Sequence, residues 1–272
     1  MALILVRYGE IGLKGTPVRR RFEHLLVADL QKALAYHGAA HSVSTTRGRI
    51  FVEVDGPEEA SQALRRVFGI TSFSPVEEVP AELPSIAAAA VEAADMGPGE
   101  SFAIRASRTG SHAFTSQEVA VVAGQAVVDA TGAPVNLDHP DREIFVEVRE
   151  QRAFVFTQKI PGPGGLPYGS QGRVVAIIED EEGLQAAWLM MRRGCTIIGV
   201  CPPALAPRVK NLYPWRGVPV EECHGELLRR AAEVAADRGA EGLVTSRQVV
   251  GGQALPVFYP LLGYWAVQEA KR

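Results

Sequence analysis

Four consecutive acidic residues stand where an α/β protein usually binds an anion. In "AIIEDEEGLQAAWLMMRRGC", residues 176–195, an apolar strand over Val174–Ile178 runs into a helix predicted over Glu182–Arg193. In a doubly wound α/β domain, a phosphate normally lies on the free N–H groups of such a helix start. Here the junction holds four carboxylates, from Glu179 to Glu182. A phosphate would be repelled, so the junction is expected to serve another purpose.

The acids have two interpretations. A helix start has free N–H groups and a positive dipole end, both of which favour acidic side chains. We expect Asp180 to cap the helix, and Glu181 and Glu182 to stabilise its first turn by about 0.3–1 kcal/mol each. The alternative is a metal site, but magnesium demands near-octahedral geometry that a helix start does not obviously provide. The structural interpretation is favoured, and because the six histidines show no ligand spacing, no metal site is predicted.

Basic side chains are the second group with chemical potential, because phosphates are bound by Lys, Arg and backbone N–H donors. The net charge is +3 over residues 1–75, −7 over 76–165 and +1 over 166–272, so only the first segment leans basic. The candidate phosphate ligands of that segment are Lys14, Arg19, Arg20, Arg21, Arg47 and Arg49. For the arginine triplet the alternative is the solvated start of a helix.

Four further basic residues lie beside turns. Arg105 and Arg108 flank a turn after a predicted strand, where they would contact phosphates or form local surface pairs. Lys159 and Arg173 flank the glycine- and proline-rich stretch "PGPGGLPYGSQG". Its glycines would either present N–H groups to a phosphate or ribose, or only make a tight turn. The turn is favoured, with a phosphate contact from Lys159.

Composition places the chain among ordinary globular proteins. It has 272 residues, of which 47% are hydrophobic and 22% charged, enough for two or three domains. The initial apolar run breaks at Arg7, and no stretch approaches the ~20 apolar residues of a membrane span. We therefore expect a cytoplasmic protein without a signal peptide. Cys195, Cys201 and Cys223 lack CxxC spacing, which favours free thiols over a disulfide framework or a zinc site.

Hydrophobic patterning predicts three structural regions. The first has the order β-α-β-β-α-β of a ferredoxin-like domain: "ALILVRYG", "RRRFEHLLVADLQKALAYHG", "HSVSTT", "RIFVEV", "PEEASQALRRVFG" and "ITSFSPV". After a predicted loop, "VEEVPAELP", the second region has two helices, a strand, and a hairpin of "REIFVEV" with "RAFVFTQKI". In the last third strands alternate with helices, which predicts a small parallel sheet covered by helices and closed by a short terminal helix. The predicted domains are 1–76, 77–165 and 166–272.

Several of these segments resemble one enzyme family in the same order along the chain. "RYGEIGLKG", "RRRFE" and "VFGI" are similar to the N-terminal ferredoxin-like domain of tRNA 4-thiouridine synthetases, the ThiI family. "SFAIRASRTGSHAFTSQEV", "VNLDHPD" and "VEVREQRAFVFTQ" resemble its THUMP domain. "GPGGLPYGSQGRVV" and "AAWLMMRRGC" resemble the entry into its PP-loop ATPase domain, with weaker similarity in "LVTSRQVVGGQ" and "PLLGY". The resemblance implies a ferredoxin-like domain, a THUMP domain and a small Rossmann-like α/β domain.

The resemblance also implies functional losses. Family members bind tRNA near its acceptor end and use ATP to activate a uridine for sulfur transfer, with a PP-loop that reads SGGxDS. On this sequence the motif falls on Glu179, Asp180, Glu181, Glu182, Gly183 and Leu184, and none of these keeps the family residue. The family's sulfur-handling cysteine lies beyond the "PLLGY" segment, and this chain ends eight residues after Tyr264. We therefore expect no catalytic residues, no cofactor and no ATP-dependent sulfur transfer.

The favoured interpretation is a tRNA-binding protein with a degenerate, truncated PP-loop domain that supports packing or docks a protein partner or a second copy. Its expected RNA contacts are the ten basic residues named above. Two alternatives stay open. One is an active tRNA-modifying enzyme, alone or with a catalytic partner chain. The other is a protein-interaction scaffold that binds no RNA, which the −7 charge of residues 76–165 would favour.

Overall fold

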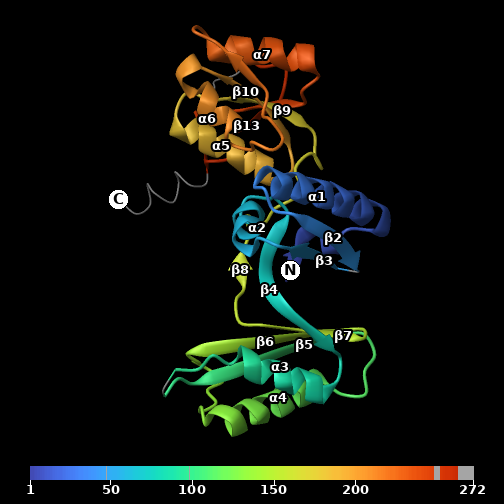
Figure 1. The fold of residues 1–272 in the computed structure, drawn as a ribbon. Helices are drawn as coiled ribbons and strands as arrows, with labels where there is room; N and C mark the ends of the chain where they lie inside the picture. Colours follow the sequence, from blue (N-terminus) through green and yellow to red (C-terminus); the bar gives the residue numbers. More distant parts are fainter. Residues whose placement is uncertain (47, 98, 248–251, 263–272) are drawn as a thin grey trace. The chain divides into compact units, whose positions relative to one another are not determined.

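The computed structural model describes residues 1–46, 48–97, 99–247 and 252–262. The chain forms two compact units: residues 1–6, 42–57 and 72–161 make up the first, and residues 7–41, 58–71 and 162–272 the second. Figure 1 follows the chain through its elements. None of the helices in the described ranges is both long and apolar enough to cross a membrane.

The first unit is built on a mixed sheet with the strand order β2-β3-β1-β4-β7-β6-β5, in which β8 also pairs with β4. Its strands are β1 (Ala2–Tyr8), β2 (His41–Thr46), β3 (Arg49–Val54), β4 (Ile70–Pro80), β5 (Phe102–Thr109), β6 (Arg142–Arg149), β7 (Arg152–Phe156) and β8 (Ile160–Pro161). The helix α1 (Thr16–Tyr36) and nearly all of α2 (Pro57–Leu64) belong to the second unit. Along the chain, these two helices and the first four strands give the predicted ferredoxin-like order. A short 3₁₀ helix, η1 (Glu10–Leu13), precedes α1.

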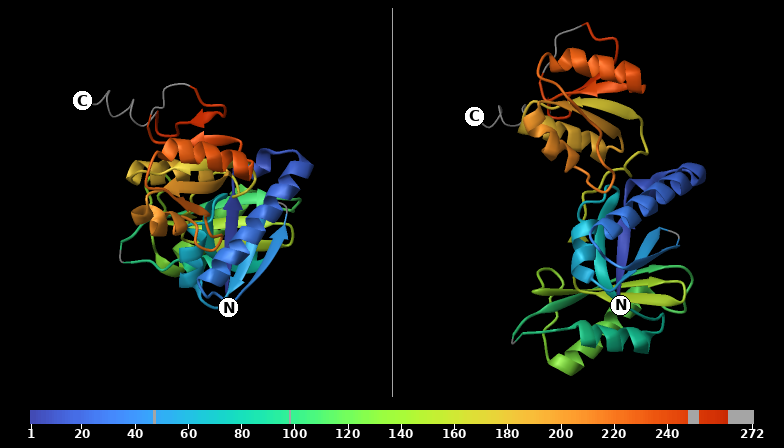
Figure 2. Two further views of the ribbon diagram at one scale, coloured as in Figure 1. Left: turned by 90° about the horizontal axis from the view of Figure 1, so that it is seen from above. Right: turned by 45° about the horizontal axis from the view of Figure 1, so that its top comes forward.

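Two helices complete the THUMP-like part of the first unit, α3 (Leu83–Ala93) and α4 (Ser116–Thr131). They lie on one face of β5, β6 and β7 (Figure 2) and enclose a core of small and branched apolar side chains. Local chemistry defines α4 at both ends. Thr115 and Glu118 form a reciprocal capping box, and Gly132 ends the helix with φ 70°.

The C-terminal α/β domain belongs to the second unit. Its five parallel strands have the order β11-β10-β9-β12-β13 and are β9 (Arg173–Ile177), β10 (Thr196–Cys201), β11 (Val220–Glu222), β12 (Gly242–Val244) and β13 (Val257–Phe258). The helical elements are α5 (Glu181–Arg192), η2 (Pro203–Leu205), α6 (Ala206–Lys210) and α7 (Leu227–Arg238). Apolar clusters on opposite faces of the sheet bring in α5 and α6 on one side and α7 on the other.

Three sequence predictions need correction. The segment predicted as the loop "VEEVPAELP" continues β4 as far as Pro80, because Glu77–Pro80 pair with β7. The predicted strand "RAFVFTQKI" is broken after Phe156, because Ile160 and Pro161 pair with β4 instead. The short elements β11 and α6 were not predicted. The predicted terminal helix lies mostly outside the described residues, and the predicted domain boundaries stay predictions, although the first falls within β4.

Candidate nucleic-acid interface and acidic helix start

The acidic junction after β9 is a capped helix start. Helix α5 begins at Glu181, and the Oδ1 of its N-cap residue Asp180 accepts a hydrogen bond from the Gly183 N–H at 2.9 Å. Glu181 and Glu182 lie in the first turn. The expected cap is therefore present, and it uses one of the N–H groups that a phosphate would otherwise approach.

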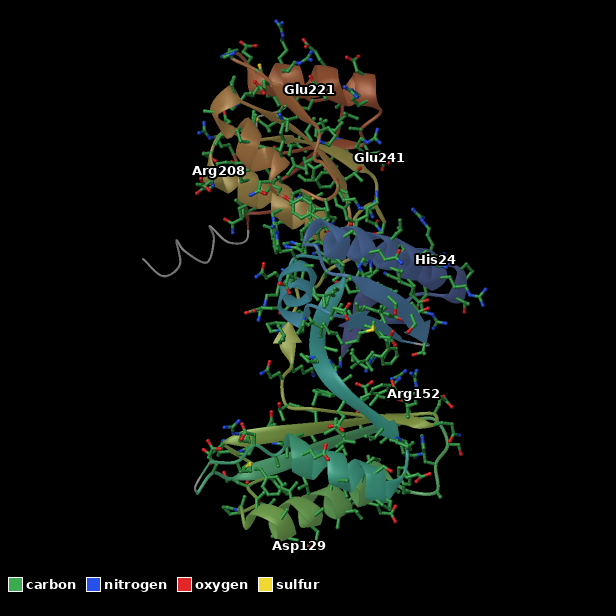
Figure 3. The ribbon with its side chains drawn as sticks, viewed as in Figure 1. His24, Asp129, Arg152, Arg208, Glu221 and Glu241 are labelled. Carbon is green, nitrogen blue, oxygen red and sulfur yellow. The ribbon has the colours of Figure 1, made fainter. Side chains whose placement is uncertain are left out.

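Two arginines pair with three of the four acids of this junction, so it keeps a net negative charge. The guanidinium of Arg247 lies 3.1 Å from a carboxylate oxygen of Glu179 and 3.5 Å from one of Asp180. Arg208, on α6 (Figure 3), forms a two-pronged ion pair with Glu181. The hydrogen bonding from Arg208 lowers the pKa of the Glu181 carboxyl. In the same way, the hydrogen bonding to Glu181 raises the pKa of the Arg208 guanidinium. The junction thus carries carboxylates with their counter-charges supplied by the chain itself.

Sequence reasoning missed both arginines, and one of them follows from the strand register that the structure shows. Strand β12 pairs parallel to β9 with Val244 opposite Ala176. Counting three residues onward along both strands places Arg247 opposite Glu179. Such a step needs the pairing of β9 with β12, which the sequence alone did not supply. Arg208 lies on a helix that was not predicted, so no sequence signal placed it.

Gly183 is required by packing. A Cβ at this position would lie 2.9 Å from the Cα of Ile178, closer than side-chain carbons approach backbone atoms. The one glycine of the junction thus lets α5 begin tightly against the end of β9. Its neighbour Leu184 is buried in the core on the α5 side of the sheet.

A cavity of about 700 Å³ opens at the carboxyl edge of the parallel sheet. Ile177, Thr245 and Arg247 line it beside the start of α7, with Glu179 and Glu226 contributing carboxylates. Within the described residues, no three His, Cys, Asp or Glu side chains lie close enough together to hold a metal ion. Burial raises the pKa of the Cys195 and Cys201 thiols, which disfavours the reactive thiolate.

The predicted basic residues near the N-terminus fall into two groups. Lys14, Arg20 and Arg21 are exposed, and no carboxylate of the described residues lies within ion-pair distance of them. Arg19 is half-buried and lies 3.9 Å from Glu23 on the next turn of α1. The triplet lies within α1, which begins earlier, at Thr16. Arg47 lies outside the described residues.

Arg49 has a different environment from the rest of its segment. Its Nε lies 2.7 Å from an oxygen of Glu147 on β6, and Arg149 approaches the same carboxylate at 3.1 Å. Glu147 is only 5% exposed. Beside this triad, the guanidinium of Arg152 lies over the ring of Phe51 (Figure 3). Arg49 thus joins β3 to the THUMP-like strands.

The four remaining basic candidates have two kinds of surroundings: some line a cavity, and others donate hydrogen bonds to backbone carbonyls. Arg105 and Lys159 line one cavity of about 610 Å³, whose lining also holds the carboxylates of Asp138, Asp141 and Glu143. Arg105 also pairs with Glu143 at 2.7 Å and donates to the Leu137 carbonyl. Two other arginines donate to nearby carbonyls: Arg108 to Gly110 and Arg173 to Arg238. The structure therefore brings together Arg105 and Lys159 out of the four.

Family models identify the first two regions of the chain. Residues 3–74 match the family model of the ThiI ferredoxin-like domain, and residues 81–158 that of the THUMP domain. The chain is 36% identical to the probable tRNA sulfurtransferase of Methanobrevibacter smithii, over 87% of this chain and 67% of the relative. It is 38% identical to that of Aeropyrum pernix, over 96% of this chain and 80% of the relative. It spans only 59% and 50% of two other curated relatives, from Methanothermobacter thermautotrophicus and Methanosarcina acetivorans.

Two solved structures have the same fold. PH1313 from Pyrococcus horikoshii Ot3 superposes with a TM-score of 0.84 at 29% identity, covering 100% of this chain and 99% of that one. A 4-thiouridine synthetase, solved as an RNA complex with bound ATP, superposes with a TM-score of 0.78 at 21% identity, covering 100% of this chain and 84% of that one. The ferredoxin-like, THUMP and parallel α/β regions are therefore those of ThiI proteins, and the chain belongs to the tRNA sulfurtransferase (ThiI) family.

Proposed function

We propose that this protein binds tRNA near the acceptor end through its ferredoxin-like and THUMP domains, in the cytoplasm, and performs no ATP-dependent sulfur transfer. The domains we propose are residues 1–76, 77–165 and 166–272. Membership of a tRNA sulfurtransferase family supports the RNA half of this proposal. We expect five cations to contact phosphates. They are the exposed Lys14, Arg20 and Arg21, and the cavity-lining Arg105 and Lys159.

The second half of the proposal, that the protein performs no ATP-dependent sulfur transfer, rests on the contact between Arg247 and Glu179. Together with the pair of Arg208 and Glu181, it fixes carboxylates at the end of β9 and the start of α5 with the chain's own cations. A nucleotide phosphate placed there would meet carboxylates, and two like charges ~4 Å apart repel by about 4 kcal/mol at an effective dielectric of 20. One such contact with an acid that has no arginine partner among the described residues, such as Glu182, weakens binding by roughly a thousandfold. The residues at this helix start do not fit a triphosphate.

The test is tRNA binding by the purified chain over a range of salt concentrations, beside the same tRNA without its 3′ end. We expect affinity to fall steeply with salt and with loss of that end. Absence of binding at low salt would contradict the RNA half. Calorimetric titration with ATP and magnesium addresses the catalytic half separately, and a micromolar Kd would overturn it.

The second candidate is an active tRNA-modifying enzyme, alone or with a catalytic partner chain. The cavity of about 700 Å³ at the carboxyl edge favours it, because this volume is typical of small-molecule sites. Nucleoside mass spectrometry would decide: 4-thiouridine formed from tRNA, ATP and a sulfur donor would establish this candidate. A scaffold without RNA is the third candidate, and the net charge of −7 over residues 76–165 favours it.

Protein association is the last part of the proposal. We propose that the C-terminal domain supports the packing of α1 and α2 and offers a docking surface to a protein partner or a second copy of the chain. Sedimentation of the purified chain, with and without tRNA, measures self-association. A monomer at all concentrations would remove the homodimer from the proposal.

A further inference from the structure

Helix α5 has a second site at its other end. A cavity of about 510 Å³ adjoins its last turn, where Leu189, Met190, Arg192 and Arg193 line it. Phe258, Tyr259 and Pro260 line it from the end of β13, and Glu10 and Gly165 complete it. At 1.5 Å per residue, the twelve residues of α5 place this cavity about 18 Å from the acidic helix start. It is therefore separate from the position of the family's nucleotide loop.

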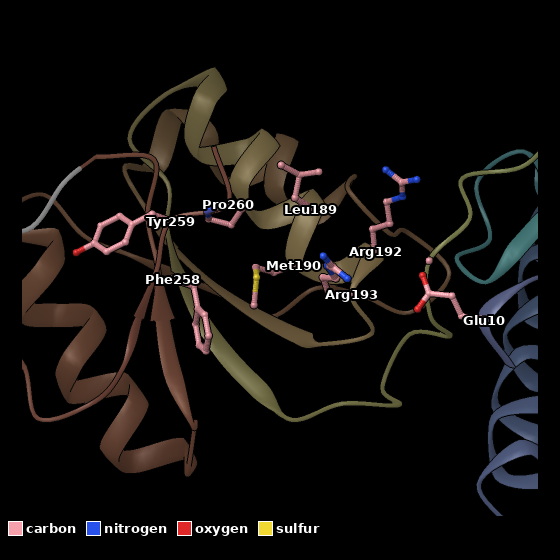
Figure 4. Close-up of a pocket in the computed structure, with 9 residues that line it drawn as sticks. Glu10, Leu189, Met190, Arg192, Arg193, Phe258, Tyr259 and Pro260 are labelled. Carbon is pink, nitrogen blue, oxygen red and sulfur yellow. The ribbon is translucent and has the colours of Figure 1, made fainter. Parts of the chain in front are cut away.

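One end of the cavity is cationic. Figure 4 shows Arg192, Arg193 and Glu10 toward one end and Phe258 and Tyr259 toward the other. Both arginines are exposed, and in the described ranges neither has a carboxylate within 4.0 Å. With the single acid Glu10, the lining carries a net charge of +1. A guanidinium can donate two parallel hydrogen bonds to two oxygens of a phosphate.

Helix electrostatics explain part of this arrangement. Cations are favoured near the last turn of a helix, and Arg192 also lies 5.9 Å from the centre of the Trp188 ring. These contacts account for basic residues at the end of α5. They do not account for the exposed aromatic ring that lines the other end of the cavity, on β13.

That ring belongs to Phe258, which is 40% exposed although it lies on a strand. It is held against Gly242 of the neighbouring strand: a Cβ at that glycine would lie 2.6 Å from the Phe258 Cε2. The absence of a side chain at Gly242 thus lets the ring rest on the sheet while part of it still faces solvent. Unpaired nucleobases stack on exposed aromatic rings, while cations in the same groove hold the backbone.

We propose that this cavity binds one unpaired nucleotide of an RNA, with its phosphate at Arg192 and Arg193 and its base against Phe258. The volume lies within the range of small-ligand sites. The inference rests on the proposed tRNA binding and extends it: the C-terminal α/β domain would read a single-stranded part of the RNA. Tyr259 and Met190 would bound the base pocket on its apolar side.

The test uses the full chain, a fluorescent single-stranded RNA pentamer and a blunt RNA duplex, over a range of salt concentrations. R192Q/R193Q should weaken pentamer binding about 10- to 100-fold and lower the slope of log affinity against log salt by roughly 1 to 1.5. F258L keeps the apolar bulk on Gly242 but removes the ring. It should weaken pentamer binding about 5- to 150-fold, leaving the salt slope and the duplex affinity unchanged.

Two controls keep the result interpretable. R229Q/R238Q removes the same charge from exposed positions of α7, on the other face of the sheet, and should change pentamer affinity less than about twofold. R192K/R193K keeps the cations at the end of α5, so the helix stays charged as before. It should preserve the salt slope while affinity falls, because lysine loses the two-pronged contact.

Equal pentamer binding by R192Q/R193Q and R229Q/R238Q would overturn the inference, as would a wild-type chain that does not bind the pentamer. Uridine monophosphate binding as tightly as the pentamer would assign the cavity to a free nucleotide and would overturn it as well. If tRNA binding by the wild-type chain stays salt-dependent while the cavity variants match wild type, only this inference fails. If the wild-type chain binds no tRNA, the proposed function itself fails.

Discussion

The carboxylate of Asp29, on α1, accepts a hydrogen bond from the hydroxyl of Tyr213 in the C-terminal α/β domain. Asp29 is fully buried, and it also accepts hydrogen bonds from Trp215 Nε1 at 3.1 Å and Arg216 Nε at 2.6 Å. The Tyr213 hydroxyl in turn accepts from the Phe68 N–H, 3.2 Å away. One buried charge thus joins a helix of the ferredoxin-like domain to the segment that follows α6, which explains why these regions form one compact unit.

Loss of this charge should weaken the second unit. D29N keeps the shape of the side chain but turns an amide N–H₂ toward groups that are themselves donors. We expect the unfolding free energy to fall by about 3 kcal/mol or more, because three partners lose a charged acceptor inside the protein. Urea unfolding followed by tryptophan fluorescence measures this directly, since Trp215 is one of the donors.

The matched control is D237N, the same chemical change at an exposed position of α7. It should shift the urea midpoint by less than a tenth of the D29N shift. Equal midpoints for D29N and wild type would mean that the cluster around Asp29 contributes nothing to stability.

Tyr213 gives the same cluster a pH dependence. Burial raises the pKa of Tyr213 well above its usual value near 10, and the charge of Asp29 raises it further. Since the folded-state pKa exceeds the unfolded one, the contribution is fully present below about pH 10 and is lost as pH rises toward the folded-state pKa. Y213F should therefore lose less stability than wild type between pH 9.5 and 11.5.

Urea midpoints at half-unit pH steps provide the measurement. Tyr168 and the thiols of Cys195 and Cys201 also have raised pKa values, but both proteins share them, so the difference between the two curves isolates Tyr213. Parallel curves over this window would show that Tyr213 ionises no later in the folded protein than in the unfolded chain.

Local patterns in the sequence predicted most of the elements, because their causes lie within a few residues. Thr115, Glu118 and Gly132 define both ends of α4. Asp180 caps α5 as expected. The alternation of strands and helices after residue 172 correctly predicted a parallel sheet.

Long-range relationships could not be predicted in this way. Asp29 and Tyr213 are 184 positions apart, and no periodicity connects them. Arg49 was grouped with the surface cations because its partner, Glu147, lies on a strand of the next domain. The extension of β4 to Pro80 likewise depends on pairing with β7, whereas the local sequence there is polar and contains proline.

The cap of α5 can be tested by its chemistry. D180A removes the acceptor for the Gly183 N–H and should lower the unfolding free energy by about 1 kcal/mol, whereas D180N should cost little because asparagine caps equally well. Thermal unfolding of both variants provides the comparison. A loss of equal size in D180N would indicate that the ion pair with Arg247, rather than the cap, stabilises this junction.

The two groups of N-terminal basic residues should respond differently to charge removal. R20Q/R21Q removes exposed guanidiniums, so it should lower the salt slope of tRNA binding by roughly 1 to 2 and leave the urea midpoint unchanged. R49Q removes one of the guanidiniums that lie against the buried Glu147, so it should lower the unfolding free energy by about 1–3 kcal/mol with little effect on the salt slope.

Both properties are measured on the same preparations, by anisotropy of labelled tRNA at five salt concentrations and by urea unfolding. The contrast depends on where each guanidinium lies, because all three substitutions remove one positive charge per site. If R49Q reduced the salt slope as much as each exposed arginine does and left stability intact, Arg49 would belong to the RNA-binding surface despite its contact with Glu147.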